Sequence, residues 1–272
     1  MALRINYNLA ASVAQRSLAS SQDNYAQQAE RLATGLRINK SSDDAAGMAI
    51  SERLKNQARG LNQAARNAQD GVSLIQTAEG AMGEAHNILS RMRELAVQAS
   101  NDTLTNTDRT NLLTEFTSLY AEIDRIATST QFNGVAILTG GSTAIKLQIG
   151  ANKDSSGDNL ITLNITPAGG FQTTRLEATM SAMGVTSQSV ANLAISTLDA
   201  AINAVSTART SIGSMQSRLE SAGRSIAVAS ENAAAANSRI ADADIAASMS
   251  ELVRSQILQQ AGISVLAQAN QA

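Results

Sequence analysis

Apolar residues recur at every seventh position over two long stretches of the chain. The first stretch begins near Ala45, ends near Ala99, and repeats Leu54, Leu61, Ala68, Ile75, Met82, Leu89 and Ala96. The second stretch repeats Leu198, Val205, Ile212, Leu219, Ile226, Ala233, Ile240 and Ala247. Such a heptad repeat predicts two long helices that pack along one line of contact, which we call the heptad seam. Alanine at most companion positions of the second repeat lets the two helices approach closely.

The two ends of the chain carry weaker apolar patterns. Residues 1–33 place only Ala11, Leu18, Tyr25 and Leu32 at heptad spacing, among many Ser, Gln and Asn residues. Residues 248–272 have a looser apolar face. A helix as polar as the first is marginal in water by itself. We therefore predict that both ends are disordered in the monomer and become helical by packing against other copies.

Polar residues mark where the helices begin and end. Gly35 and the run 39–44 separate the N-terminal helix from the first long helix, and their Ser and Asp side chains can cap a helix that begins near Ala45. Residues 101–103 end the long helix. A third helix, capped by Thr107 or Asp108, is predicted to end near Ala127.

The apolar period changes to two in the middle of the chain. The alternating residues are Ile145, Leu147 and Ile149, and then Ile161, Leu163 and Ile165. They predict two strands paired as a hairpin across the loop 152–159, followed by an irregular segment, 166–187. The predicted fold class is therefore mainly α: a long coiled-coil-like helical bundle formed by N- and C-terminal heptad helices, with a small β-hairpin region in the middle of the chain.

Composition narrows the classes of function. The 272 residues include 2% aromatics, no Trp, no Cys and a single proline, Pro167, and the net charge is −2. A chain with so little charge has no basic surface for nucleic acid, and no apolar run is long enough to span a membrane. The N-terminus lacks the apolar core of a cleaved signal peptide. We therefore expect a protein that is cytoplasmic or exported without a cleaved signal.

Candidate chemistry is sparse. His86 is the single histidine and lies within a predicted helix. One histidine cannot form a transition-metal site of the usual type, and a catalytic triad has no second candidate base. Asp43 and Asp44 are neighbours in a predicted turn, where capping explains them. Asp242 and Asp244 lie beside alanines in the second heptad stretch and are interpreted as solvated. The sequence predicts no catalytic, cofactor-binding or metal-ligating residues, no cofactor, and a protein that is not an enzyme.

Several long motifs resemble those of the bacterial flagellins. In the N-terminal half they are GLRINKSSDDAAGMAISERL (35–54), NAQDGVSLIQTAEGAM (67–82), RMRELAVQASN (91–101), EIDRI (122–126) and QFNG (131–134). In the C-terminal part they are SRIADADIA (238–246) and ILQQAGISVLAQANQ (257–271). Between them, residues 140–190 resemble the family's variable region in a minimal form.

The resemblance implies a structural protein that polymerises into the flagellar filament for swimming motility. Residues 1–45 would form the terminal helix and spoke of the inner filament core, and 242–272 its C-terminal helix. Residues 46–241 would form a helical rod domain with the hairpin. The implied partners are other copies of the chain in a helical homopolymer, a flagellar export chaperone, the cap protein and hook-associated proteins. The implied location is extracellular, after flagellar type III secretion.

One charged run has two interpretations. Arg91, Arg93 and Glu94 can form a solvated helix face with pairs three and four residues apart. The run LSRMRELAVQAS (89–100) also resembles the flagellin segment that a vertebrate Toll-like receptor recognises. The resemblance places Arg91, Leu95 and Glu115 at receptor-contacting positions. The predicted assembly seam comprises Leu54, Leu61, Ile75, Leu89, Leu198, Val205, Ile212, Leu219, Ile226 and Ile240.

Two other functions compete with the filament subunit. A hook–filament junction protein of the same family would share its terminal motifs. A cytoplasmic helical signalling rod would share the alanine-rich heptads, but the predicted strands at 145–165 argue against it.

Overall fold

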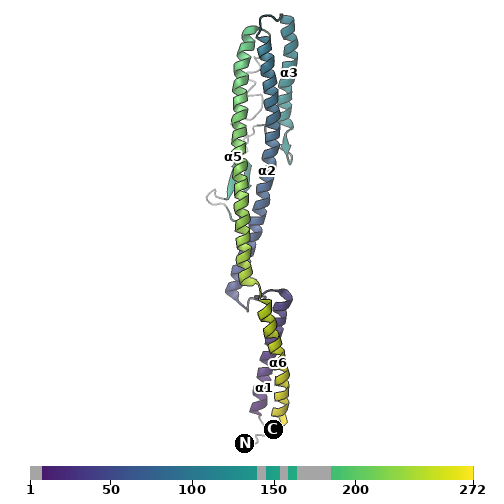
Figure 1. Ribbon diagram of the computed structural model, residues 1–272, viewed down its shortest axis with the longest axis vertical. Helices are drawn as coiled ribbons and strands as arrows, with labels where there is room; N and C mark the ends of the chain where they lie inside the picture. Colours follow the sequence, from purple (N-terminus) through teal and green to yellow (C-terminus); the bar gives the residue numbers. More distant parts are fainter. Residues whose placement is uncertain (1–7, 140–144, 154–158, 164–184, 272) are drawn as a thin grey trace. The chain divides into compact units, whose positions relative to one another are not determined.

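The computed structural model describes residues 8–139, 145–153, 159–163 and 185–271, and its described elements are mainly helical (Figure 1). The helices are α1 (Leu9–Thr34), α2 (Ala45–Ala99), α3 (Asn106–Ser129), α5 (Gln188–Ala241) and α6 (Ile245–Gln271). The strands are β1 (Gln131–Phe132), β2 (Val135–Ala136), β3 (Ile145–Gln148) and β4 (Leu160–Leu163). The predicted fold class is confirmed, and α2 begins and ends at the predicted residues.

The chain divides into two compact units. One contains residues 1–59 and 230–272, and therefore α1, α6 and one end of each of α2 and α5. The other contains Gly60–Ala229, with α3, the strands and the remainder of α2 and α5. The boundaries near residues 45 and 242, which the sequence suggested for filament domains, stay a prediction. Among the helices of the described residues, none is long and apolar enough to cross a membrane.

The core of the second unit is the heptad seam between α2 and α5, covered by α3. Ile75, Met82 and Leu89 of α2 pack with Leu198 and Ile212 of α5, and all are buried. Further buried residues in this core come from α3, namely Phe116 and Ile123. Small alanines between the larger side chains let a chain with so few aromatic residues fill its core.

Ion pairs across α2 and α5 show that these helices run antiparallel. Arg93 Nε donates to Asp199 Oδ1 at 2.6 Å, and Arg209 lies 3.8 Å from Glu79. The partner numbers fall along α5 as they rise along α2, as they must in an antiparallel pair.

The cap of α3 differs from the prediction. Thr105 is the N-cap residue, because its hydroxyl accepts from the Asp108 N–H while the Asp108 carboxylate accepts from the Thr105 N–H. Asp108 therefore acts as the third helical residue of a capping box rather than as the cap itself. The Thr105 hydroxyl also donates to Asp108 Oδ2 at 2.6 Å, and this bond, followed by that from the Thr105 N–H, lowers the pKa of Asp108.

The predicted hairpin is confirmed. Strands β3 and β4 are antiparallel, with Leu147 opposite Ile161. Ile149 follows the end of β3, and Ile165 and the segment 166–184 lie outside the described residues. The hairpin lies against α2 at Gly71, where a Cβ atom would collide with Leu147, and Asn67 Nδ2 donates to the Gln148 carbonyl at 2.9 Å. Glycine at 71 thus leaves room for the Leu147 side chain to pack against α2.

Truncation of a seam residue should weaken the second unit. Leu219 is fully buried, so Leu219→Ala should lower the free energy of unfolding by about 2–5 kcal/mol, and Leu61→Ala, in a smaller cluster with Ala64 and Ile226, should act in the same direction. Urea denaturation followed by circular dichroism measures the change. The control is Leu193→Ala on α5, whose side chain is 64% exposed and should matter by less than about 0.5 kcal/mol. Equal stability of all three variants would contradict the assignment of the core.

Candidate functional site

The terminal helices α1 and α6 lie side by side and antiparallel (Figure 1). Near the chain ends, Asn8 Nδ2 donates to the Ala269 carbonyl at 2.7 Å. Further along, Gln259 Nε2 donates to the Ser21 carbonyl at 3.2 Å. These contacts join segments from opposite ends of the sequence.

The facing sides of α1 and α6 mix leucines and one tyrosine with small and polar residues. On α1 the less exposed positions follow three–four spacing and include Ala11, Ala14, Leu18, Ser21, Tyr25, Gln28 and Leu32. On α6 they follow the same spacing: Ser248, Leu252, Ser255, Gln259, Gly262, Leu266 and Ala269. Ser255 is only 2% exposed, whereas α1 has no buried residue at all. In this pair the most deeply buried side chain is therefore a serine, whereas the leucines are only half-buried.

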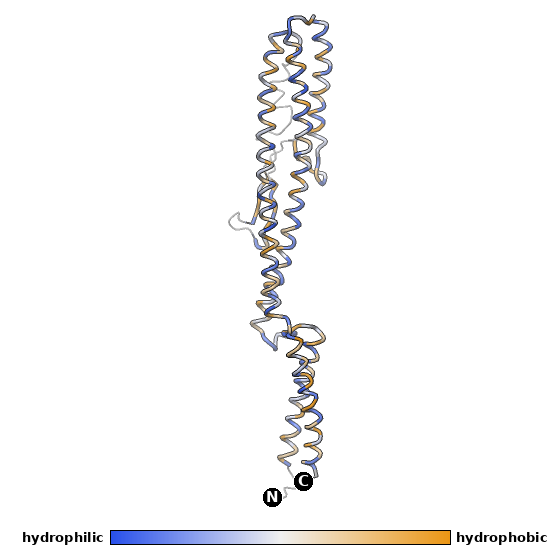
Figure 2. Tube along the Cα trace, viewed as in Figure 1, coloured by the Kyte–Doolittle hydropathy of each residue, from blue (hydrophilic) through white to orange (hydrophobic). Residues whose placement is uncertain are grey.

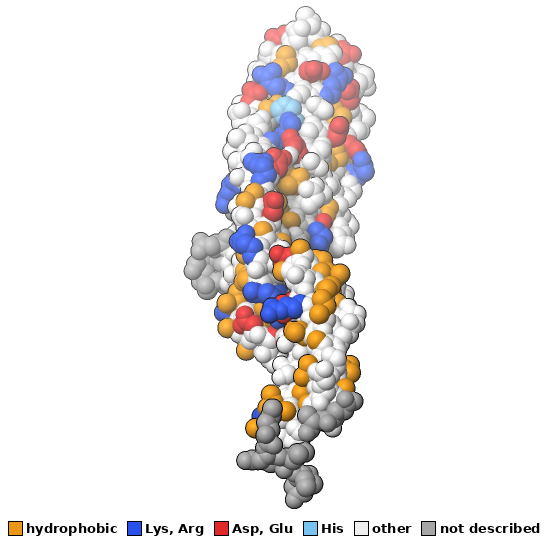
Figure 3. Space-filling model, turned by 60° about the horizontal axis from the view of Figure 1, so that its bottom comes forward, with side chains coloured by type: hydrophobic (Ala, Val, Ile, Leu, Met, Phe, Trp, Pro, Cys, Tyr) orange, Lys and Arg blue, Asp and Glu red, His pale blue; other side chains and the backbone are white. Residues whose placement is uncertain are grey.

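Most of the large apolar side chains of α6 are exposed. Ile245, Met249, Val253, Ile257, Leu258, Ile263 and Val265 are all exposed, and Ile257 reaches 60%. We call this set the α6 outer face. Figure 2 shows hydrophobic positions along α6, and Figure 3 shows exposed apolar side chains over the α1–α6 part of the chain. An exposed apolar set of this size in one helix marks a surface that another molecule covers.

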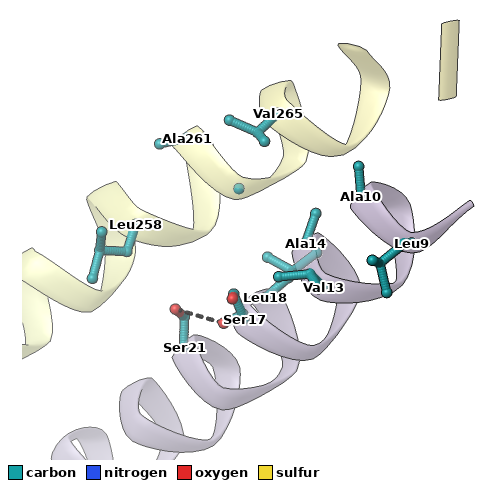
Figure 4. A pocket seen from close by; sticks show the side chains of 11 residues that line it. Leu9, Ala10, Val13, Ala14, Ser17, Leu18, Ser21, Leu258, Ala261 and Val265 are labelled. Carbon is teal, nitrogen blue, oxygen red and sulfur yellow. Dashed lines mark hydrogen bonds between the residues drawn. The ribbon is translucent and has the colours of Figure 1, made fainter. Parts of the chain in front are cut away.

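An apolar groove runs between the outer parts of α1 and α6 near the chain ends. Its volume is about 800 Å³. In Figure 4 the side chains that line it come from both helices, among them Leu9, Val13 and Leu18 of α1 and Leu258 and Val265 of α6. Because nearly all of these side chains are aliphatic, the groove suits another apolar helix rather than a charged ligand.

The loop between α1 and α2 is held by one carboxylate. Asp43 Oδ2 accepts from the backbone N–H groups of Asn39 and Lys40, each at 3.1 Å, and its Oδ1 accepts from Gln27 of α1 at 3.3 Å. The backbone bond from Lys40, followed by that from Asn39, lowers the pKa of Asp43. The adjacent Asp44 accepts from the Gly47 N–H at 2.8 Å and caps α2. The predicted roles in capping and turn formation are confirmed, since Asp44 caps α2 and Asp43 holds the turn before it.

An isolated antiparallel β-bridge joins this loop to the segment between α5 and α6. Leu36 pairs with Asp242, the Arg37 N–H donates to the Ala241 carbonyl at 2.7 Å, and the Ala243 N–H donates to the Gly35 carbonyl at 2.9 Å. The heptad stretch predicted to continue to Ala247 is therefore interrupted after Ala241. The prediction failed because periodicity reports side-chain burial, whereas this break depends on backbone bonds to residues some 200 positions away.

The residues of the predicted assembly seam lie in the chain's own packing. Two of them, Leu54 and Ile240, are half-buried. The others are buried: Leu61, Ile75, Leu89, Leu198, Val205, Ile212, Leu219 and Ile226. Their side chains are therefore occupied within one chain, and a role in assembly stays a prediction.

Two of the three residues matched to a receptor-binding segment are exposed and paired. Arg91 of α2 donates from Nε to Glu115 of α3 at 3.0 Å and from Nη1 to Glu94 at 3.0 Å. Leu95 is only 1% exposed and packs in the core, so a direct receptor contact by its side chain does not fit this structure.

The sequence did not single out Arg37 or the α6 outer face. A signal for the second was present, because Ser248, Ser255 and Gln259 follow the spacing that apolar residues occupy in an ordinary helix pair.

Comparisons with known proteins agree on one family. Residues 5–143 match the bacterial flagellin N-terminal helical region, and residues 195–272 match the bacterial flagellin C-terminal helical region. A flagellin from Halalkalibacterium halodurans is 46% identical over 98% of this chain and 96% of its own length. A flagellin from Bacillus subtilis is 40% identical over 99% of this chain and 97% of its own length.

A solved structure is similar as well. The crystal structure of Bacillus cereus flagellin superposes with a TM-score of 0.50 at 35% identity, over 59% of this chain and 88% of that one. With two family regions matched and full-length relatives at this identity, the chain belongs to the bacterial flagellin family.

Proposed function

We propose that this chain is a structural subunit that polymerises into the bacterial flagellar filament for swimming motility, with α1 and α6 as the contacts between subunits. The single observation that supports these contacts most is the exposed apolar surface of α6, on which Ile257 is 60% exposed although Ser255 nearby is buried. Other copies of the same chain can cover that surface on several sides, since each copy brings both an apolar face and an apolar groove.

Energetics favour ordering of these helices in a polymer. Fixing the backbone costs about 1–2 kcal/mol per residue, and a helix pair in which no residue of α1 is fully buried recovers only part of that cost. Each large aliphatic side chain covered by a neighbour contributes about 1.5–3 kcal/mol. The α6 outer face alone offers seven such side chains. Packing between subunits can therefore supply what packing within one chain does not.

The proposal assigns parts of the chain to parts of the filament. Residues 1–45 and 242–272 form the inner core, and 46–241 form the surrounding helical domain, with the variable region at 140–190. The subunit is exported without a cleaved signal by flagellar type III secretion and acts outside the cell. Its partners include the export chaperone, the cap protein and hook-associated proteins.

The proposal includes no catalytic activity and no cofactor. Asp43, Asp44 and Asp108 accept backbone N–H groups at helix ends. Arg91 and Arg93 form ion pairs with acidic residues. These interactions stabilise helices and require no bound substrate.

Polar substitution of the α6 outer face should block assembly. Val253→Ser combined with Ile257→Ser removes two exposed side chains worth about 1.5 kcal/mol each when covered, so the critical concentration for polymerisation should rise about 100-fold. Sedimentation and negative-stain electron microscopy measure it. Leu193→Ser, at an exposed position of α5, is the matched control and should polymerise normally. Equal polymerisation of the double serine variant and the Leu193→Ser control would exclude the α6 outer face as the contact. Short caps in place of filaments from the parent chain would favour a junction protein.

The ends of the free monomer should be accessible to protease. We expect limited proteolysis to remove residues 1–33 and 248–272 and to stop at the helical domain, because neither end is well packed by itself. Deletion of either end should abolish polymerisation and leave the melting of 46–241 nearly unchanged. Resistance of both ends in the monomer, or full-length filaments from the trimmed chain, would refute assembly by ordering of the ends.

We also propose that Arg91 and Glu115 form a surface recognised by a Toll-like receptor. Arg91→Ala combined with Glu115→Ala removes a charged pair that spans α2 and α3, and should strongly reduce signalling in a cell reporter assay. Arg125→Ala with Glu122→Ala removes an exposed pair on α3 alone and serves as the control. An unchanged response to the first variant would reject the proposal.

A further inference from the structure

Helices α1 and α5 both end next to the bridge between Leu36 and Asp242, but the local sequence accounts only for the end of α1. Helix α1 ends at Gly35, which has a φ of +71°, a left-handed conformation that glycine adopts without steric cost. Helix α5 ends at Ala241, yet the sequence has neither glycine nor proline between Gly223 and Gly262. None of residues 242–244 has a positive φ. Local sequence therefore does not oblige α5 to stop where it does.

The bridge replaces the hydrogen bonds that would continue α5. In an unbroken helix each N–H donates to the carbonyl four residues earlier. The Ala243 N–H would then donate to Arg239, and the carbonyls of Ile240 and Ala241 would accept from Asp244 and Ile245.

In the structure, residues 35–37 form hydrogen bonds with all three of these backbone groups. The Gly35 carbonyl accepts from Ala243, and the Arg37 N–H donates to Ala241. The Arg37 guanidinium donates to the Ile240 carbonyl through Nε at 3.2 Å and Nη2 at 2.8 Å. A cation at this position also interacts favourably with the C-terminal end of a helix. The Ala243 N–H and the Ile240 and Ala241 carbonyls thus each have a substitute partner from the loop.

We infer that Arg37 is a positioning residue that keeps residues 242–244 out of the helix, and that without it α5 and α6 join into one continuous helix. The segment is then a two-state element, in which the bridge and the continuous helix compete for the same backbone groups. One local signal opposes the continuous helix, because Asp244 Oδ1 accepts from the Ala247 N–H at 3.1 Å and caps α6. A test must therefore separate Arg37 from Asp244.

A proline at the start of α6 can lock the break. Ile245 is exposed and is the first residue of α6, a position that proline tolerates. Proline there forces the preceding residue into an extended conformation and clashes with the carbonyl of Ala241 in a continuous helix. Ile245→Pro should thus restore the break in a chain that lacks Arg37.

Backbone carbon chemical shifts of residues 242–244 in the soluble full-length chain provide the measurement. We expect non-helical values in the parent and helical values in Arg37→Ala, more fully so with Asp244→Ala added. Arg37→Ala with Ile245→Pro should return to non-helical values. Arg53→Ala is the matched control, since that guanidinium donates to the Ala49 carbonyl of its own helix at 3.3 Å, and it should match the parent.

Non-helical shifts in Arg37→Ala with Asp244→Ala, or helical shifts in the parent, would overturn the inference. A second readout rests on the proposed function: Arg37→Ala should raise the critical concentration about tenfold, the effect of a lost charged hydrogen bond, and Ile245→Pro should reverse much of that rise. If Ile245→Pro does not reverse the rise in critical concentration, Arg37 does not act by keeping α5 and α6 apart. Failure of the parent to polymerise would refute the proposed function and leave the chemical-shift result standing.

Discussion

A helix pair that buries serine and leaves large isoleucine and valine side chains exposed gains less than a usual pair by folding alone in water. The α1–α6 pair is built this way, with Ser255 buried and Ile257 exposed. The apolar surface that usually stabilises a helix pair is left for other molecules to cover. The stability of this part of the chain and its assembly into a polymer thus depend on the same side chains.

The unit formed by Gly60–Ala229 instead buries its large apolar side chains between its own helices. Its heptad seams place Ile75, Leu89 and Leu198 between helices, and α3 and the β3–β4 hairpin cover further apolar surface. Alanine and glycine let these elements approach closely enough to exclude water without large aromatic rings. Its core is therefore complete within one chain, whereas the terminal helices have none of their own.

Sequence reasoning succeeded where a local pattern decides the structure. Seven-residue spacing located α2 and α5, period-two alternation located the β3–β4 pair, and Gly35 ends α1 as a glycine cap does. It failed at the end of α5, because the break there depends on backbone hydrogen bonds to the distant residues near Leu36, and the residues around Asp242 do not indicate that bridge. It also could not tell that Leu95 lies inside the core, since a helix in contact with both α3 and α5 buries more than one face.

The buried guanidinium of Arg109 has a consequence for the order of folding. From the start of α3 it donates to the carbonyls of Ala99 and Asn101 at the end of α2, only ten and eight residues away. The ion pair of Arg93 with Asp199 instead joins residues 106 positions apart. Because closing a short loop costs less entropy than closing a long one, the α2–α3 corner should form early, and the pairing with α5 should follow. During synthesis the side of α2 that packs against α5 therefore remains uncovered until most of the chain has been made.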